Sequence, residues 1–216
     1  MTSAAATPTF AREMLVSPLT GPSKRSEADA RVGMMIFLAS WGMVFLTLFF
    51  ASTVLRLRAG AWPPPDSPLL PSATQNSAWA ITAAILASSF ALHRAGKLAR
   101  AGRSTAARLA YSATMLLGCL FFVLQVYSWV EAARAGVELQ GSIYGGLFYA
   151  LTAFHAAHVL AGLGALIWAL PSVTRIADAG SAEETLRDRI RLSSAASFWH
   201  FVDLAWIATF LAVFLV

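Results

Sequence analysis

The chain of 216 residues is too apolar for a soluble protein, because 57% of its residues are hydrophobic and 12% are charged, whereas ordinary soluble domains have about 25% charged residues. Its single cysteine, Cys119, excludes an internal disulfide. The net charge of +5 follows from the membrane topology predicted below. It therefore indicates affinity for anionic lipid headgroups and no nucleic-acid partner.

The N-terminal segment, residues 1–31, is polar and contains three prolines. It lacks the apolar core that a cleavable signal peptide requires. We expect it to form a cytoplasmic arm in front of a membrane domain that covers residues 32–216.

Five apolar runs follow, and we expect each to cross the membrane as an α-helix, since about 20 mostly apolar residues are enough to span a bilayer. The second run is short and contains serine and threonine. The predicted fold class is an all-α integral membrane bundle of five transmembrane helices. The spans are expected at about residues 32–55, 76–95, 109–130, 143–170 and 195–216.

Basic residues give this topology an orientation. If the N-terminus is cytoplasmic and all five runs span, the 16 basic residues lie on the cytoplasmic side except Arg56, Arg58 and Arg134. Such an excess on one side is the positive-inside bias. It supports the second span and predicts a periplasmic C-terminus.

Two connecting segments have a distinct composition. Residues 56–79 hold five prolines, with Trp62 and Trp79 near the ends, and suit an extended lid at the outer membrane interface. The segment 182–191 carries both signs of charge and is expected to form a short surface helix before the last span.

Four polar side chains are expected inside the membrane: His155 and His158 in the fourth span, and His200 and Asp203 in the fifth. Asp203 would lie roughly 14 Å deep at about 1.5 Å per residue, where insertion costs about 2.5–3.5 kcal/mol. Such residues face the bundle interior and usually pair. The expected partner is His200 or a histidine of the fourth span.

Three interpretations of these residues remain open. They can form a polar network that sets helix register, a lipid-headgroup site or protonatable relay, or a metal or haem site. Haem ligation fits worst, because His158 and His200 would lie at different depths, about 18 Å and about 9 Å. The sequence contains no phosphate-binding glycine loop and no nucleophile elbow. We therefore expect no catalytic, cofactor-binding or metal-binding residue.

Several stretches resemble subunit III of the haem-copper terminal oxidases. The segment FWHFVDLAW (198–206) resembles the family signature Tyr-Trp-His-Phe-Val-Asp-x-x-Trp, and IYGGLFYALTAFHAAHV (143–159) resembles its histidine-containing span. Weaker matches are GMMIFLAS, Asn76 with Ser88, Ser89 and His93, and LLGCLFFVLQVYSW. Five spans resemble the short bacterial form of the family.

The chain departs from the family pattern at three carboxylates. Trp41, Ser128 and Ser193 stand where the pattern has glutamate. This puts a proton-linked role for those positions in doubt. It also keeps open a divergent branch, an accessory protein of a nitric oxide reductase.

The resemblance implies a non-catalytic, multi-pass subunit in the bacterial inner membrane. Haem and copper would lie in partner subunits. The chain would pack directly against oxidase subunit I, in a complex with subunit II and a small subunit IV, bind phospholipids, and support sustained turnover and dioxygen access. The alternatives are the nitric-oxide-reductase accessory protein and a stand-alone membrane carrier.

For the site, we expect His155, His158, His200 and Asp203 to form one polar seam between the fourth and fifth spans. Five further residues are candidates for lipid or interface contacts: Asn76, His93, Trp62, Trp199 and Tyr149.

Overall fold

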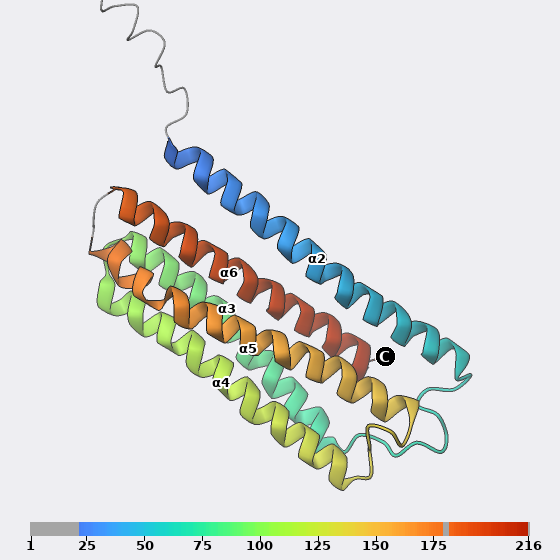
Figure 1. The fold of residues 1–216 in the computed structure, drawn as a ribbon. Helices are drawn as coiled ribbons and strands as arrows, with labels where there is room; N and C mark the ends of the chain where they lie inside the picture. Colours follow the sequence, from blue (N-terminus) through green and yellow to red (C-terminus); the bar gives the residue numbers. More distant parts are fainter. Residues whose placement is uncertain (1–21, 179–181, 216) are drawn as a thin grey trace, which may run out of the picture.

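The computed structural model describes residues 22–178 and 182–215, and all of the long elements in these ranges are helices. The helices run up and down with short connections between their ends (Figure 1). Their bounds are α2 (Pro22–Arg58), α3 (Ser72–Arg100), α4 (Ser104–Arg134), α5 (Ile143–Ala177), α6 (Ala182–Phe210) and a final π-helical turn, η1 (Leu211–Leu215).

The five helices divide into a group of four and one outlier. Helices α3 to α6 pack together, and α2 lies along one side of that group, next to α6 (Figure 1). The main core joins buried residues of all four packed helices. The described residues therefore form an all-helical bundle, which is consistent with the predicted membrane bundle.

Four of the helices are long and apolar enough to cross a membrane, counting only the described residues: α2, α4, α5 and the helix that includes α6 and η1. Helix α3 has 29 residues, as many as α6, but it is not among the helices whose apolar window is long enough and apolar enough to span. Its Thr74, Ser77 and Ser88 are buried toward the other helices. A fifth span and the orientation of the termini stay predictions.

Two helices begin earlier than expected. Helix α2 starts at Pro22, a residue well suited to the first helical position, so residues 22–31 of the expected arm are helical. Residues 1–21 lie outside the described part of the chain. Helix α6 starts at Ala182 and continues into the last span, so the helix expected at 182–191 is present as the first turns of a longer helix.

The charged start of α6 is held against the end of α5, which explains its continuity. Asp188 is 6% exposed. It accepts hydrogen bonds from Arg175 Nε at 2.8 Å and Nη2 at 3.1 Å, and from Ser172 Oγ at 2.7 Å. A bidentate arginine–carboxylate pair is a strong and directional contact, so it fixes the α5–α6 hairpin at this end.

The proline-rich connection packs onto the opposite end of the bundle. Its Leu70 belongs to a small core cluster with residues of α4 and α5. Its Trp62 lies 5.5 Å from the Tyr144 ring, and the Arg56 guanidinium lies 4.7 Å above Trp62.

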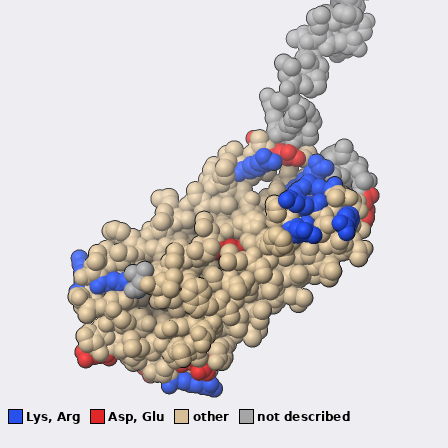
Figure 2. Space-filling view, turned by 180° about the vertical axis from the view of Figure 1, so that it is seen from behind, with Lys and Arg blue, Asp and Glu red and all other residues tan. Residues whose placement is uncertain are grey.

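Basic side chains gather at one end of the molecule. Figure 2 shows the larger cluster of Lys and Arg beside the place where α2 begins, with a mostly uncharged body between it and the smaller charged groups at the far end. The first cluster combines the three segments that the sequence places on one side of the membrane. The fold therefore agrees with the charge pattern.

Candidate functional site

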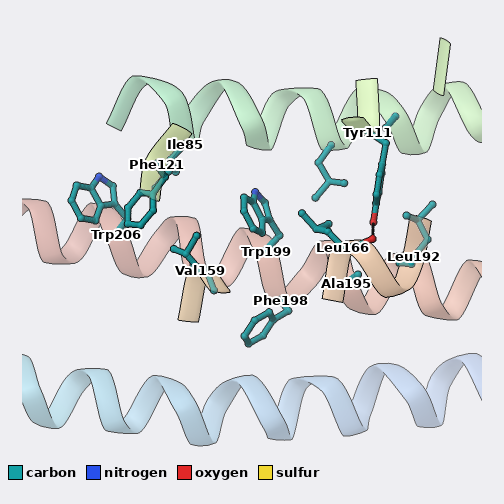
Figure 3. Close-up of a cluster of buried hydrophobic side chains, with 14 of the residues drawn as sticks. Ile85, Tyr111, Phe121, Val159, Leu166, Leu192, Ala195, Phe198, Trp199 and Trp206 are labelled. Carbon is teal, nitrogen blue, oxygen red and sulfur yellow. Dashed lines mark hydrogen bonds between the residues drawn. The ribbon is translucent and has the colours of Figure 1, made fainter. Parts of the chain in front are cut away.

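The middle of the bundle is built around one indole. Trp199 of α6 is 1% exposed, and a Cβ placed on Gly118 of α4 or Gly162 of α5 would meet its ring at 2.7 Å and 3.0 Å. Its Nε1–H donates to Ser88 Oγ of α3 at 3.0 Å. The side chain therefore contacts all the other helices of the group (Figure 3).

Other aromatic side chains join helices in the same way. Trp206 Nε1–H donates to Thr82 Oγ1 at 3.0 Å, which ties α6 to α3. The Tyr111 hydroxyl donates to the Leu166 carbonyl at 2.8 Å, which ties α4 to α5 (Figure 3). An apolar ring with one satisfied polar atom suits a membrane interior, where an unsatisfied donor is costly.

Asp203 lies in a hydrogen-bonded cluster between α3 and α6. Its side chain is 7% exposed, and its Oδ2 accepts the hydroxyl proton of Ser89. That hydroxyl oxygen lies 2.8 Å from His200 Nδ1 and is available to accept its proton. Asp203 Oδ1 is buried without a hydrogen-bond partner among the described residues.

His155 occupies a different place, in the core between α4, α5 and α6. It is 0% exposed, with its ring centroid 5.4 Å from Phe121 and 5.2 Å from Trp206. Neither ring nitrogen has a hydrogen-bond partner in the part of the chain that the structure describes.

His158 faces α2. Its Nδ1 lies 2.7 Å from the Phe154 carbonyl, one turn earlier in α5. Its ring centroid lies 4.7 Å from Trp41 and 5.0 Å from Phe45. Its Nε2 is buried and, within residues 22–178 and 182–215, has no hydrogen-bond partner.

The four expected seam residues are therefore distributed over three sites. The structure brings His200 and Asp203 together and adds Ser89. It places no hydrogen bond between this pair and His155 or His158. Of the two expected partners of Asp203, His200 is the one nearby, with its Nδ1 3.8 Å from Asp203 Oδ2, and Ser89 of α3 supplies the hydrogen bond. The reason is geometric, because the polar face of α6 is turned to α3.

The other candidates are scattered as well. Asn76 and His93 are exposed on α3, and Trp62 is half-buried in the connection before it. The Tyr149 hydroxyl lies 3.0 Å from the Val137 carbonyl, close to the α4–α5 turn. Trp199 lies in the core described above.

Two polar residues that the fold brings inside were not among the site residues predicted from the sequence. Ser89 completes the Asp203 cluster, and Gln125 is 1% exposed with no partner for either amide atom among the described residues. A serine in an apolar helix is common and gives no distinct signal. A glutamine at mid-membrane depth is a signal, and it could have been singled out as Asp203 was.

A cavity of about 830 Å³ opens between α2, α3 and α6, at the basic end seen in Figure 2. One end of it is charged, with Glu27 and Arg31 from α2, Arg100 from α3 and Arg189 from α6. The other end reaches His200. Methionine and leucine side chains line much of the wall: Met34, Met35, Leu38, Leu92 and Leu192.

The three positions that depart from the family pattern are found in three separate settings. Trp41 packs on His158, Ser128 is 1% exposed and its carbonyl accepts from Thr74 Oγ1 at 3.3 Å, and Ser193 lines the cavity. At position 41 this chain therefore has an aromatic contact with His158 where the family pattern has a carboxylate.

The described residues include no group of three or more His, Cys, Asp or Glu side chains that could hold a metal ion. What the arrangement offers chemically is proton exchange at His200 and Asp203 and electrostatic attraction of anions at the mouth of the cavity.

Comparison with known proteins identifies the family of this chain. The family model described as cytochrome c oxidase subunit III matches residues 19–216. A probable cytochrome c oxidase subunit 3 of Nocardia farcinica is 33% identical over 217 residues, covering 100% of both chains. The cytochrome c oxidase subunit 3 of Corynebacterium diphtheriae is 31% identical over 219 residues, with 100% of both covered. That of Synechocystis is 28% identical over 187 residues, covering 85% of this chain and 74% of the relative. Family and fold agree with the resemblance seen in the sequence, and the chain belongs to the cytochrome c oxidase subunit III family.

Proposed function

We propose that this chain is a non-catalytic subunit of a haem-copper oxidase in the bacterial inner membrane, where it packs against the catalytic subunit I and binds phospholipid. Haem and copper would be carried by subunits I and II, with a small subunit IV as a further partner. The names of the relatives favour an oxidase over the nitric-oxide-reductase and carrier alternatives.

The observation that carries the packing proposal is a row of small residues on the outer face of α5. Ala153, Ala157 and Ala161 recur every fourth residue and are exposed. A Cβ added to Gly164, one turn further, would meet nothing within 4 Å. Small residues allow the backbones of membrane helices to approach closely, and none of the helices described in the structure covers this row.

A matched pair of variants tests the packing proposal. Ala157→Leu would hold a partner helix away and should strongly reduce the haem that co-purifies with an affinity-tagged chain. Ala87→Leu, at an exposed alanine of α3, is the control and should leave the yield unchanged. Equal haem yields from both variants would show that this face of α5 does not contact the catalytic subunit.

The lipid proposal rests on the cavity between α2, α3 and α6. Three guanidinium groups at its mouth can bind an anionic headgroup, and its methionine and leucine walls suit an acyl chain. A lipid held there would fill the space between α2 and the other helices, stabilise the complex through many turnovers and offer dioxygen an apolar route toward the catalytic subunit.

Phospholipid analysis of the purified complex tests this step. Arg31→Gln with Arg189→Gln should lower the bound anionic phospholipid per complex and shorten the time over which turnover is sustained. Arg58→Gln, at an exposed position at the other end of α2, is the control. Unchanged lipid content and unchanged turnover in the double variant would contradict lipid binding in the cavity.

A further inference from the structure

The cavity leads to a buried carboxylate. Its lining on α2 extends from Glu27 to Leu38, and its lining on α6 extends from Arg189 to His200. Each stretch is about 16 Å long at about 1.5 Å per residue. The cavity therefore begins at the charged end of the bundle and reaches well into the apolar region, where His200 forms part of its wall.

Polar side chains line the α6 wall in a regular row. Ser193, Ser197 and His200 all line the cavity, and their spacing of four and three residues places them on one face of the helix. Asp203 continues the row by another three residues. On the facing helix, His93 lines the cavity and Ser89 lies one turn further in.

At the end of this row the groups are hydrogen-bonded in series. The His200 side chain is 44% exposed and its Nδ1 lies 2.8 Å from Ser89 Oγ, which donates its proton to Asp203 Oδ2. Asp203 Oδ1 is buried and has no partner among the described residues. The series thus joins a group that reaches the cavity to one that does not.

We propose that this series is a proton-exchange path, and that Asp203 is a proton-binding site in equilibrium with the solution at the charged end of the bundle. This goes beyond the structural and lipid roles proposed above. Chains of Asp, Glu and His side chains form proton relays in membrane pumps and transporters, and here the cavity supplies the access.

The proton balance closes with the groups present. A proton from the cavity binds His200 at Nε2, the Nδ1 proton passes to Ser89 Oγ, and the serine proton passes to the Asp203 carboxylate. One proton has then moved to Asp203, and His200 is left as the neutral tautomer protonated at Nε2. The same transfers in reverse move the proton from Asp203 through Ser89 Oγ to His200 Nδ1 and release the Nε2 proton to the cavity, which restores the starting state.

The charges that bias this path come from three helices. Arg31 and Glu27 on α2, Arg100 and His93 on α3, and Arg189 on α6 line the same cavity, whereas α5 contributes Ile176, which does not titrate. The cationic groups oppose an excess of protons in the cavity and favour the ionised carboxylate. Occupation of the mouth by an anionic headgroup would weaken this bias.

Infrared difference spectroscopy of the purified protein tests the proposal, with the pH stepped over the range in which the protein stays folded. Asp203→Asn, which keeps an acceptor for Ser89, identifies the protonated-carboxyl band of Asp203 as the band that it removes. The wild-type band should rise and fall with pH and should shift on transfer to heavy water. The measurement requires only the folded chain, so its outcome is separable from assembly with an oxidase.

The rate of deuterium exchange at this band tests the path. Ser89→Ala and His200→Gln should each slow the exchange about tenfold or more, since a positioned proton-transfer group typically contributes roughly 10²- to 10⁴-fold. His93→Gln, which alters the cavity wall outside the hydrogen-bonded series, should exchange at the wild-type rate. If Ser89→Ala does not fold, His200→Gln still tests the path, because His200 is half-exposed and its replacement should not disturb folding. An Asp203 band that does not respond to pH, or wild-type exchange rates in the path variants, would overturn the proposal.

Discussion

Helix α2 is at least as apolar as the candidate spans of the α3–α6 group, but the two regions are held in different ways. Only 6% of the apolar window of α2 is buried within the chain, compared with 50% of the window that includes α6. Helix α2 has a mean hydropathy of 2.1 over that window, higher than the 1.8 of α6. Hydropathy therefore does not separate a core helix from a peripheral one.

Side-chain hydrogen bonds distinguish the core helices from the peripheral helix α2. On α2, Ser40 and Thr47 donate to carbonyls one turn earlier in the same helix, both at 2.9 Å. In the bundle, Ser89 and the indole donors of Trp199 and Trp206 form hydrogen bonds across helices. Interhelical hydrogen bonds and close packing at small residues drive helix association in lipid. Hydrogen bonds between helices therefore hold a helix in place, whereas hydrogen bonds within one helix do not.

Helix α2 is attached mainly by rings. Phe45 lies 4.9 Å from Phe154, 5.0 Å from His158 and 6.0 Å from Phe201. Such contacts favour packing without fixing one geometry as strictly as a hydrogen bond does. The difference indicates a bundle of one defined packing with a more loosely attached helix that borders the cavity.

The largest effect is expected where the bundle has no spare space. Gly118→Ala would place a Cβ 2.7 Å from Trp199 Cη2 and 2.8 Å from Leu163 Cδ2. Overpacking of this kind typically costs about 1–3 kcal/mol. Thermal unfolding followed by circular dichroism should show a clear drop in Tm. Gly164→Ala is the matched control, because nothing lies within 4 Å of its Cβ, and an unchanged Tm in both variants would contradict the packing around Trp199.

The next effect is expected at the Asp203 cluster. Asp203→Leu removes the acceptor of Ser89 and leaves its hydroxyl and the His200 ring without this partner, so the α3–α6 contact should loosen. We expect a lower Tm and a complex that loses lipid or dissociates during purification, with Asp203→Asn close to wild type. Normal complex yield, lipid count and long-term turnover for Asp203→Leu would show that the cluster does not shape the bundle.

A local effect is expected for the attachment of α2. Phe45→Ala removes three ring contacts and should broaden the distance distribution between spin labels on α2 and α6, while the packing of α3 to α6 stays intact. The labels require prior replacement of Cys119, which is exposed. Phe50→Ala, whose ring is 72% exposed, should leave the distances unchanged. If Phe45→Ala unfolds the whole chain, α2 is part of the core and the comparison fails.

The smallest effect is expected at His155. Its ring is enclosed by Phe121 and Trp206 and makes no hydrogen bond among the described residues. Replacing a buried polar group that lacks partners by an apolar one of similar shape is nearly neutral or stabilising, so His155→Phe should retain or raise the Tm. A strong loss of stability or assembly would show that His155 has a polar partner in the complex.

The sequence by itself determined the class of the protein and much of its plan. Apolar runs of sufficient length predict membrane helices, the basic segments agree with the shared end seen in the fold, and the FWHFVDLAW signature identified the family. These properties depend on local composition and on order along the chain, which a sequence displays directly. At 182–191 the expected helix is present, but the sequence did not show that it continues into the last span, because a charged surface helix and the charged start of a long helix have the same local pattern.

Only the tertiary structure decided which polar residues meet. Helical spacing places His155 and His158 near one another on α5, yet one ring faces the core and the other faces α2, so the predicted single seam is absent. Asp203 finds Ser89, a residue 114 positions away, because α6 turns that face toward α3. Rotation of each helix about its axis is set by packing, here by Trp199 between Gly118 and Gly162, and no local pattern in the chain records that rotation.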